Sequence, residues 1–227
     1  MLADALLRLN FRTRGPWVTR FRINGRAYGG WYDVSDDDRM REFRRRFEPC
    51  SVLELGCLEG GFTVELVRRG YEVTAVDGRP ENLERARWIS SRLSLDASFH
   101  LADLEQVRLR GFGRFDVVFC CGLLYHLPRP WELVTQLPSV APRLFLSTHY
   151  AATEEEVVEG FGGRWYKELG REDPFSGLSR RSFWFTKPAL LELLRASGYT
   201  RIEITHDGLH KNGPLLSLVA LTYGRPV

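Results

Sequence analysis

Ser51-Val-Leu-Glu-Leu-Gly-Cys-Leu-Glu-Gly-Gly-Phe62 is followed along the chain by Tyr71-Glu-Val-Thr-Ala-Val-Asp77, and these two stretches decide the fold. Each contains a short apolar run, which is typical of a strand buried within a sheet. Between the runs lie a glycine-rich turn, a helix-like segment and Gly70, a residue type that commonly ends helices. This order predicts a βαβ unit that binds the adenosine half of a cofactor related to nucleotides.

The alternation of strand and helix continues toward the C-terminus. We expect strands at Ser51–Leu55, Glu72–Val76, Ala97–Leu101, Phe115–Cys120, Arg143–Thr148, Thr200–Thr205 and Leu215–Tyr223. We expect helices at Gly61–Arg69, Pro80–Leu93, Pro130–Leu137 and Thr186–Ala196. The last two strands are joined by a connection too short for a helix, so they should pair antiparallel. The predicted fold is α/β: a Rossmann-like, doubly wound, seven-stranded, mostly parallel sheet with a terminal antiparallel hairpin.

Two segments lie outside this pattern. Residues 1–49 should form an N-terminal cap, with a short helix at Leu2–Leu9, a hairpin around Asn24-Gly25 and a charged helix at Asp36–Phe47. Residues 150–186 are rich in glycine, aromatic residues and charge, and they show no clean periodicity. A connection of that length predicts a functional insertion, or lid. The expected domains are therefore the cap, 1–49, and a main domain, 50–227, that carries the lid.

Composition sets limits on the class of protein. The 227 residues suffice for one α/β domain with additions. No apolar run approaches the roughly 20 residues that span a bilayer, so we expect no membrane association. The first nine residues include Asp4 and Arg8, which argues against a signal peptide. The four cysteines form no C-x-x-C pair, so they predict buried thiols in a reducing compartment, the cytoplasm.

Charge is unevenly distributed although the net charge is only +3. The cap holds eleven arginines against seven acidic residues, with the densest cluster at 44–46. One interpretation is a solvated helix face. The other is a contact surface for an anionic substrate, such as RNA or a phosphorylated sugar.

Acidic residues at strand ends refine the cofactor prediction. Asp77 ends the second strand, where an acid can accept hydrogen bonds from ribose hydroxyls. Asp103 follows the third strand, where it could accept from an adenine amine beside the Leu104 N–H. Glu54 precedes the glycine turn, and a carboxylate there suits a cationic ligand better than a pyrophosphate.

At these residues the chain resembles the class I S-adenosylmethionine-dependent methyltransferases, which carry acid-x-Gly-x-Gly-x-Gly after the first strand. Here the pattern reads Glu54-Leu-Gly56-Cys-Leu58-Glu-Gly60. Leu58 replaces the middle glycine, which is tolerable if that backbone keeps a negative φ. The resemblance covers residues 50–149 and 187–227 and implies S-adenosylmethionine as the cofactor. The residues that it implies for cofactor binding are Glu54, Gly56, Cys57, Gly60, Asp77, Gly78, Asp103, Leu104 and Cys121.

A closer resemblance is to a subgroup that carries three short motifs. They are LEGG, GR..N and GLLYHL, here Leu58–Gly61, Gly78-Arg79 with Asn82, and Gly122–Leu127. The last motif also occurs in relatives that modify the wobble uridine of tRNA. The subgroup therefore leaves the substrate open.

The chemistry should lie beyond the carboxyl ends of the strands. His149 is the first candidate for a general base, followed by His126, and Tyr125 could line the cofactor or the substrate. The residues expected to bind the substrate are Tyr150, Trp165, Tyr166, Trp184, His206 and His210. We expect no metal site, because the acids at 154–156 are consecutive on a predicted helix start and cannot converge on one ion.

The function that fits best is methyl transfer from S-adenosylmethionine to a small or medium acceptor, with an oxygen nucleophile on a sugar or natural product favoured. Modification of tRNA or another RNA is the first alternative. A nicotinamide-dependent oxidoreductase and a non-catalytic binding module are the others. The sequence leaves the oligomeric state open.

Overall fold

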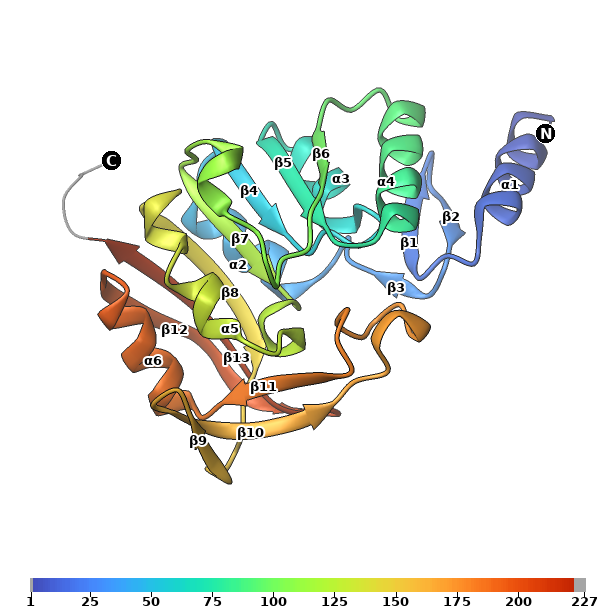
Figure 1. Ribbon diagram of the computed structural model, residues 1–227. Helices are drawn as coiled ribbons and strands as arrows, with labels where there is room; N and C mark the ends of the chain where they lie inside the picture. Colours follow the sequence, from blue (N-terminus) through green and yellow to red (C-terminus); the bar gives the residue numbers. More distant parts are fainter. Residues whose placement is uncertain (1, 223–227) are drawn as a thin grey trace.

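The computed structural model describes residues 2–222, and a seven-stranded sheet forms its centre (Figure 1). Across the sheet the strands are ordered β12-β13-β8-β7-β4-β5-β6. Their bounds are β4 Ser51–Leu55, β5 Glu72–Asp77, β6 Ser98–Leu101, β7 Val117–Cys121, β8 Arg143–His149, β12 Tyr199–His210 and β13 Gly213–Thr222. Strands β8, β7, β4, β5 and β6 are parallel, whereas β13 is antiparallel to both β8 and β12. The predicted Rossmann-like sheet and its terminal hairpin are confirmed.

The terminal hairpin is longer than the sequence predicted. β12 continues through His206 to His210, so these two histidines lie in a strand and not in a connecting loop. Only Lys211 and Asn212 separate β12 from β13. The second half of this edge strand was not predicted, because its sequence mixes polar and apolar residues without a clear alternation. The predicted end of the last strand, Tyr223, lies outside the described residues.

Helices cover both faces of the sheet. Within residues 2–222 the six α-helices are α1 Leu2–Arg14, α2 Asp38–Arg46, α3 Gly61–Val67, α4 Pro80–Arg92, α5 Pro130–Val134 and α6 Lys187–Ala196. Four 3₁₀ turns accompany them: η1 Leu109–Phe112, η2 Leu124–His126, η3 Leu137–Ser139 and η4 Gly170–Glu172. Capping explains several starts, because the side chains of Asp37 and Thr186 accept backbone N–H groups of α2 and α6, and a proline opens α4. None of the helices described between residues 2 and 222 is long and apolar enough to cross a membrane.

Alternating strand residues build two separate cores. Val118 and Leu144 face the layer that contains α5 and α6, whereas Phe119 and Phe145 face α2 and α3. The two phenylalanine rings stack with their centroids 5.7 Å apart, and Phe43 of α2 packs on both. Burial of both strand faces explains why these strands read as continuous apolar runs.

The cap contains a longer first helix than predicted and a small sheet of β1 Thr19–Ile23, β2 Arg26–Gly29 and β3 Tyr32–Asp33. The hairpin between β1 and β2 turns at Asn24 and Gly25, both with positive φ, as the Asn-Gly signal indicates. A third apolar cluster joins the cap to α3 and α4, with Phe11 and Phe21 packed beside Val64 and Ile89.

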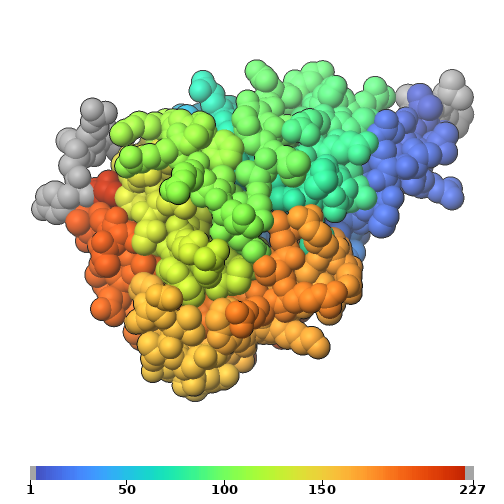
Figure 2. Space-filling model, viewed as in Figure 1, coloured from blue at the N-terminus to red at the C-terminus, as the bar shows by residue number. Residues whose placement is uncertain are grey.

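The lid is more regular than predicted. It forms an antiparallel sheet of β9 Glu156–Val158, β10 Phe161–Lys167 and β11 Arg181–Phe185, which passes beneath the carboxyl ends of β7 and β8 (Figure 1). The predicted helix start at residues 154–156 was wrong, because Glu156 begins β9. Gly162 and Gly163 interrupt the alternation of apolar and polar side chains along β10. They are needed there because a Cβ on Gly163 would lie 2.3 Å from the Trp184 carbonyl oxygen. In the space-filling view the orange lid segment adjoins the green and yellow surface of the main domain (Figure 2).

Candidate active site

A cavity of about 1370 Å³ opens at the carboxyl ends of the parallel strands. Single small-molecule sites usually occupy roughly 300–1,000 Å³, so this cavity has room for two molecules side by side. The glycine turn after β4 and the end of β5 line one part of it. The cap, the lid and the hairpin β12–β13 line the other part.

The glycine turn lines the first part through residues of unusual backbone conformation. Gly56 has φ +76°, and a Cβ on it would approach the Leu123 side chain to 3.1 Å. Leu58 has φ +51°, so the condition under which a leucine is readily tolerated there, a negative φ, is not met. Its N–H donates to Asp77 Oδ2 at 2.8 Å, and this bond holds the residue in the left-handed region. That conformation costs a non-glycine residue roughly 1–2 kcal/mol.

Asp77 is the central acceptor of this turn. Besides the Leu58 N–H, it accepts the Arg79 N–H at 2.9 Å and Asn82 Nδ2 at 3.1 Å, both on Oδ1. The side chain is 7% exposed and lines the cavity. Burial raises the pKa of Asp77, although the hydrogen bonds oppose that rise. A carboxylate has about four acceptor positions, so roughly one remains for a ligand.

Two residues expected to touch the cofactor lie behind the turn. The carboxyl of Glu54 is fully buried, accepts Thr63 Oγ1 at 2.6 Å and does not line the cavity. Burial raises the pKa of Glu54 to about 8, with a smaller contribution from Asp77. Gly60 packs against α4, where a Cβ would meet Ala86 Cβ at 3.1 Å. Both residues support the turn from behind in this structure.

The other residues expected at the cofactor line the cavity. Asp103 Oδ1 accepts the Glu105 N–H at 2.9 Å within a turn, and Leu104 lies next to it. Gly78 lies against the lid, since a Cβ on it would meet Leu178 Cδ1 at 2.7 Å. Burial raises the pKa values of Cys57 and Cys121, so both line the site as neutral thiols.

Aromatic rings gather around His149 at the end of β8. The Tyr125 ring lies 4.8 Å from the His149 ring, the Trp184 ring stacks on it at 5.3 Å, and His210 lies at 5.5 Å, all between centroids. His149 Nδ1 lies 3.0 Å from the Pro214 carbonyl oxygen. A carbonyl only accepts, so Nδ1 carries the proton and Nε2 keeps its lone pair. Burial lowers the pKa of His149, which keeps the ring neutral at pH 7.

His126 lines the same cavity and is held by the lid. Its Nδ1 lies 3.0 Å from Glu168 Oε1, which also accepts Ser182 Oγ at 2.8 Å. Burial raises the pKa of Glu168, but the hydrogen bonds from His126 and Ser182 outweigh it and lower the pKa. Glu168 is thus an ionised carboxylate, and His126 Nδ1 donates to it. Sequence reasoning did not identify Glu168, because no motif surrounds it.

The residues expected to bind the substrate divide into two groups. Tyr166, Trp184, His206 and His210 line the cavity. Tyr150 and Trp165 do not line it: Tyr150 donates to Asp207 at 2.8 Å, and Trp165 packs on Phe183. The adjacent residues His149 and Tyr166 line it instead, because successive side chains of an extended chain point to opposite sides. Among the described residues, no group of three or more His, Cys, Asp or Glu could hold a metal ion.

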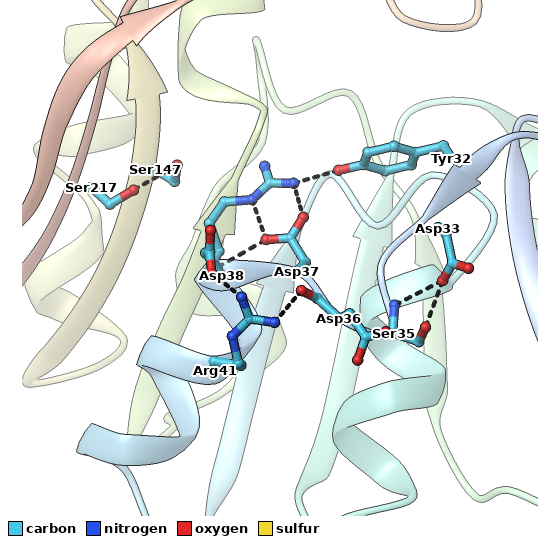
Figure 3. Close-up of polar contacts among 10 residues, drawn as sticks. Tyr32, Asp33, Ser35, Asp36, Asp37, Asp38, Arg41, Ser147 and Ser217 are labelled. Atoms are coloured by element: carbon cyan, nitrogen blue, oxygen red, sulfur yellow. Dashed lines mark hydrogen bonds and ion pairs between the residues drawn. The ribbon is translucent and has the colours of Figure 1, made fainter.

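The cap contributes a polar wall that the sequence did not predict. Arg39 donates to Asp37 and, through Nη2, to the Tyr32 hydroxyl at 2.5 Å, and its guanidinium lies 5.0 Å from the centre of the Phe62 ring. Figure 3 draws Asp37 and Tyr32 of this network together with Ser147 and Ser217, which also line the cavity and whose hydroxyls form a hydrogen bond of 3.0 Å. A further aromatic pair, Trp31 and Phe175, meets at the rim with centroids 5.4 Å apart.

Two residues inside the quoted motifs have structural roles that sequence reasoning missed. Glu59 of LEGG is buried and accepts the N–H groups of Val18 at 2.9 Å and Thr19 at 2.6 Å, so it fastens the cap to the glycine turn. Arg79 of GR..N is buried against the lid. Buried charged residues are rare unless paired, but a sequence does not reveal which charges are buried.

Sequence comparison identifies a matching family and similar curated proteins. Residues 52–140 match the family model described as methyltransferase domain. The ubiquinone biosynthesis O-methyltransferase of Xanthomonas axonopodis pv. citri (strain 306) is 31% identical over 115 residues, 48% of each chain. That of Caulobacter vibrioides (strain ATCC 19089 / CIP 103742 / CB 15) is 32% identical over 97 residues, 43% of this chain and 38% of the relative. The chain thus spans about half the length of the curated relatives it matches, or less.

Solved structures are similar over nearly the whole chain. The N-terminal domain of EvdMO1, crystallised in the presence of SAH and D-fucose, superposes with a TM-score of 0.86 at 30% identity and covers 96% of this chain and 97% of that one. The 1,6-didemethyltoxoflavin-N1-methyltransferase of Burkholderia thailandensis superposes with a TM-score of 0.61 at 22% identity, over 98% of this chain and 89% of that one. The second likeness shows the fold alone.

Proposed function

The chain belongs to the class I S-adenosylmethionine-dependent methyltransferases, and from that premise we propose that its acceptor is a hydroxyl group of a sugar or of a small molecule that contains a sugar. The observation that carries the proposal is a neutral, oriented histidine, His149, at the reaction face of a cavity with room for two molecules. The similar EvdMO1 domain, crystallised with D-fucose, supports a sugar.

The residues present fit the cofactor. Asp77 retains an acceptor position for a ribose hydroxyl, and the turn through Gly56 and Leu58 would let the ligand approach the backbone. Asp103 and the Leu104 N–H would meet the adenine ring. Arg39 keeps Nη1 without a hydrogen-bond partner among residues 2–222, beside Gly122, where a carboxylate group could be held. When bound, S-adenosylmethionine supplies a methyl group on a positively charged sulfonium.

The acceptor side explains why an oxygen nucleophile is favoured. A hydroxyl group must lose its proton as it attacks, and a neutral imidazole within hydrogen-bond reach takes that proton. The Pro214 carbonyl fixes the His149 tautomer, and the lowered pKa keeps Nε2 unprotonated at neutral pH. Trp184 and Tyr125 surround the ring and exclude water from it. Alignment of the hydroxyl with the methyl group then provides the remaining rate enhancement.

The alternatives considered from the sequence have less support. Family membership decides against a nicotinamide-dependent oxidoreductase. RNA modification is disfavoured because acids neutralise much of the cap's positive charge. A binding module without activity would form no methylated product. We also propose a cytoplasmic location, which the four free cysteine thiols support.

Transfer of labelled methyl groups tests the proposal. The wild-type protein is incubated with methyl-labelled S-adenosylmethionine and, in parallel, with D-fucose, other deoxyhexoses, their glycosides and bulk tRNA. We expect label in a sugar O-methyl ether that resists mild alkali. The matched control is His149→Gln, which should bind SAH but transfer little. Label in tRNA with no labelled sugar would overturn the sugar proposal.

A further inference from the structure

Arg79 makes an unusual set of contacts with the lid. Its guanidinium donates to four backbone carbonyl oxygens more than ninety residues away in the sequence: Gly170 at 2.9 Å, Arg171 at 3.0 Å, Asp173 at 2.9 Å and Ser176 at 3.1 Å. The residue is 5% exposed, and the nearest carboxylate, that of the exposed Glu81, is 3.9 Å away. Burying a cation with no close counter-ion is costly, so carbonyl dipoles provide most of its compensation.

The same point of the chain borders the cofactor part of the cavity. The Arg79 N–H donates to Asp77, the proposed ribose acceptor. Leu178 of the lid rests on Gly78, where a Cβ would lie 2.7 Å from it. The dipeptide Gly78-Arg79 is therefore the place where the lid segment 168–178 docks on the end of β5.

The other end of that segment reaches the acceptor part of the cavity. Glu168 holds His126 Nδ1 at 3.0 Å, and its second oxygen accepts the Gly177 N–H at 3.3 Å. Gly177 itself packs on the His126 carbonyl, since a Cβ there would meet that oxygen at 2.2 Å. With Nδ1 donating to Glu168, Nε2 is the ring nitrogen left for an acceptor molecule.

We propose that Arg79 is a positioning residue for methyl transfer: its guanidinium fixes the lid segment 168–178, and that segment fixes the His126 ring through Glu168. Arg79 borders the cavity, and in this role its guanidinium acts through the lid segment. The assignment of His126 to the acceptor side rests on the proposed function, whereas the link from Arg79 to His126 does not.

The link is tested by nuclear magnetic resonance without any acceptor. The chain has five histidines, so ¹⁵N-histidine labelling gives a simple spectrum, and loss of a signal in His126→Gln assigns its Nδ1–H. We expect this proton to exchange with water at least tenfold faster in Arg79→Ala. Arg79→Lys should behave similarly, because an ammonium cannot reproduce the planar fork of donors. An unchanged signal in both variants would overturn the proposal.

The matched control is Arg87→Ala in α4, the helix that begins directly after Arg79. The exposed guanidinium of Arg87 donates to one carbonyl, that of Phe99, away from the lid. This variant should leave the His126 signal unchanged. Thermal unfolding of every variant shows whether it is folded. If Arg79→Ala is unfolded, Arg79→Lys still tests the proposal.

A double-mutant cycle tests the consequence for the reaction. With D-fucose, or whichever sugar the wild type methylates, Arg79→Ala and Glu168→Ala should each lower turnover at least tenfold, and SAH affinity should change less than threefold. If Arg79 acts through Glu168, adding Arg79→Ala to Glu168→Ala lowers turnover by less than threefold more. Fully multiplicative losses would overturn the route through Glu168. If the wild type methylates no sugar, the proposed function fails, and the resonance experiment still decides the role of Arg79.

Discussion

Glu54 and Asp77 are both strand-end carboxyls beside the glycine turn, yet their environments give them different roles. Glu54 has one hydrogen-bond donor, Thr63, and burial dominates its pKa. Asp77 has three donors and faces the cavity. A hydrogen-bonded carboxylate at the ligand suits recognition, whereas a protonated carboxyl behind the turn suits packing.

Asp77→Asn tests recognition at the scale of one residue. The amide keeps an acceptor oxygen but loses the charge, and losing a charged hydrogen-bond partner costs about 1.5–3 kcal/mol. We expect the dissociation constant for SAH, measured by calorimetry, to rise about 10–100-fold. Asp116→Asn, at the other end of the strands beside Ser51, should leave it unchanged. Equal affinities in the two variants would make Asp77 only a turn residue.

The raised pKa of Glu54 predicts a pH-dependent stability. A carboxyl whose folded pKa lies above its unfolded value of 4.5 contributes stability that is fully present below pH 4.5 and is lost as pH rises through about 8. Relative to Glu54→Gln, the wild type should lose at most about 1.4 kcal/mol of unfolding free energy per pH unit in that window. Urea unfolding between pH 5 and 9 measures this, and parallel curves would contradict it.

His149→Gln tests the proposed base. Removal of a general base usually lowers turnover about 10²–10⁴-fold, whereas SAH affinity should stay the same. In the wild type, turnover should rise with pH until it passes the lowered pKa of His149, below the ordinary 6.5, and then level off. The variant should lack that rise. A rise in turnover of the same size in the wild type and in His149→Gln would mean that another group removes the proton.

The depressed pKa of His149 also affects folding. Its contribution to stability is present above the unfolded pKa and is lost as pH falls through the folded value. Stability and turnover should therefore decline together on the acidic side.

At the scale of elements, the glycine turn organises its surroundings. Glu59 accepts hydrogen bonds from the backbone N–H groups of Val18 and Thr19 in the cap, and it forms an ion pair with Arg85 of α4 at 3.1 Å. Arg79 lies three residues after Val76, in the loop that follows β5, and binds the lid. Two accessory elements far apart in the sequence thus attach to the loops that follow β4 and β5.

Glu59→Ala should loosen the cap. Removing one partner of a buried ion pair typically costs about 3–5 kcal/mol, and for a chain of this size each kcal/mol lowers the melting temperature by about 2–4 °C. We expect a clear fall in melting temperature and faster amide exchange in β1. Glu84→Ala, an exposed residue on α4, serves as the control. Equal melting temperatures for the two variants would show that the hydrogen bonds and ion pair of Glu59 contribute little to the stability of the protein.

At the scale of the whole molecule, charge pairing bears on the choice of partner. Seven of the eleven cap arginines form ion pairs with acids: Arg8, Arg22, Arg26, Arg39, Arg41, Arg45 and Arg46. Such pairs reduce the positive potential that a phosphate backbone would meet. The cap arginines therefore fit the solvated face better than the RNA contact surface.

Bulk tRNA binding tests this conclusion. We expect only non-specific binding, no tighter than roughly 10⁻⁶ M at 0.15 M salt, which weakens steeply as salt increases. Filter binding at two salt concentrations measures it, with bovine serum albumin as the negative control. Tight, saturable binding of one tRNA at the higher concentration would restore the RNA alternative.

The sequence alone determined the sheet, the terminal hairpin, the family and the cofactor. These follow from apolar periodicity and from glycines and acids at fixed spacing, which act within one strand–turn–helix unit and are therefore readable locally. The strand that carries His149 was predicted for the same reason.

Only the tertiary structure decided that Leu58 has a positive φ, that Glu54 lies behind the turn and that Arg79 holds the lid. Each depends on a partner from another segment: Asp77 for Leu58, Thr63 for Glu54, and carbonyls more than ninety residues away for Arg79. Burial and hydrogen bonding between distant segments set the conformation and protonation of a side chain, and neither is encoded in the residues next to it.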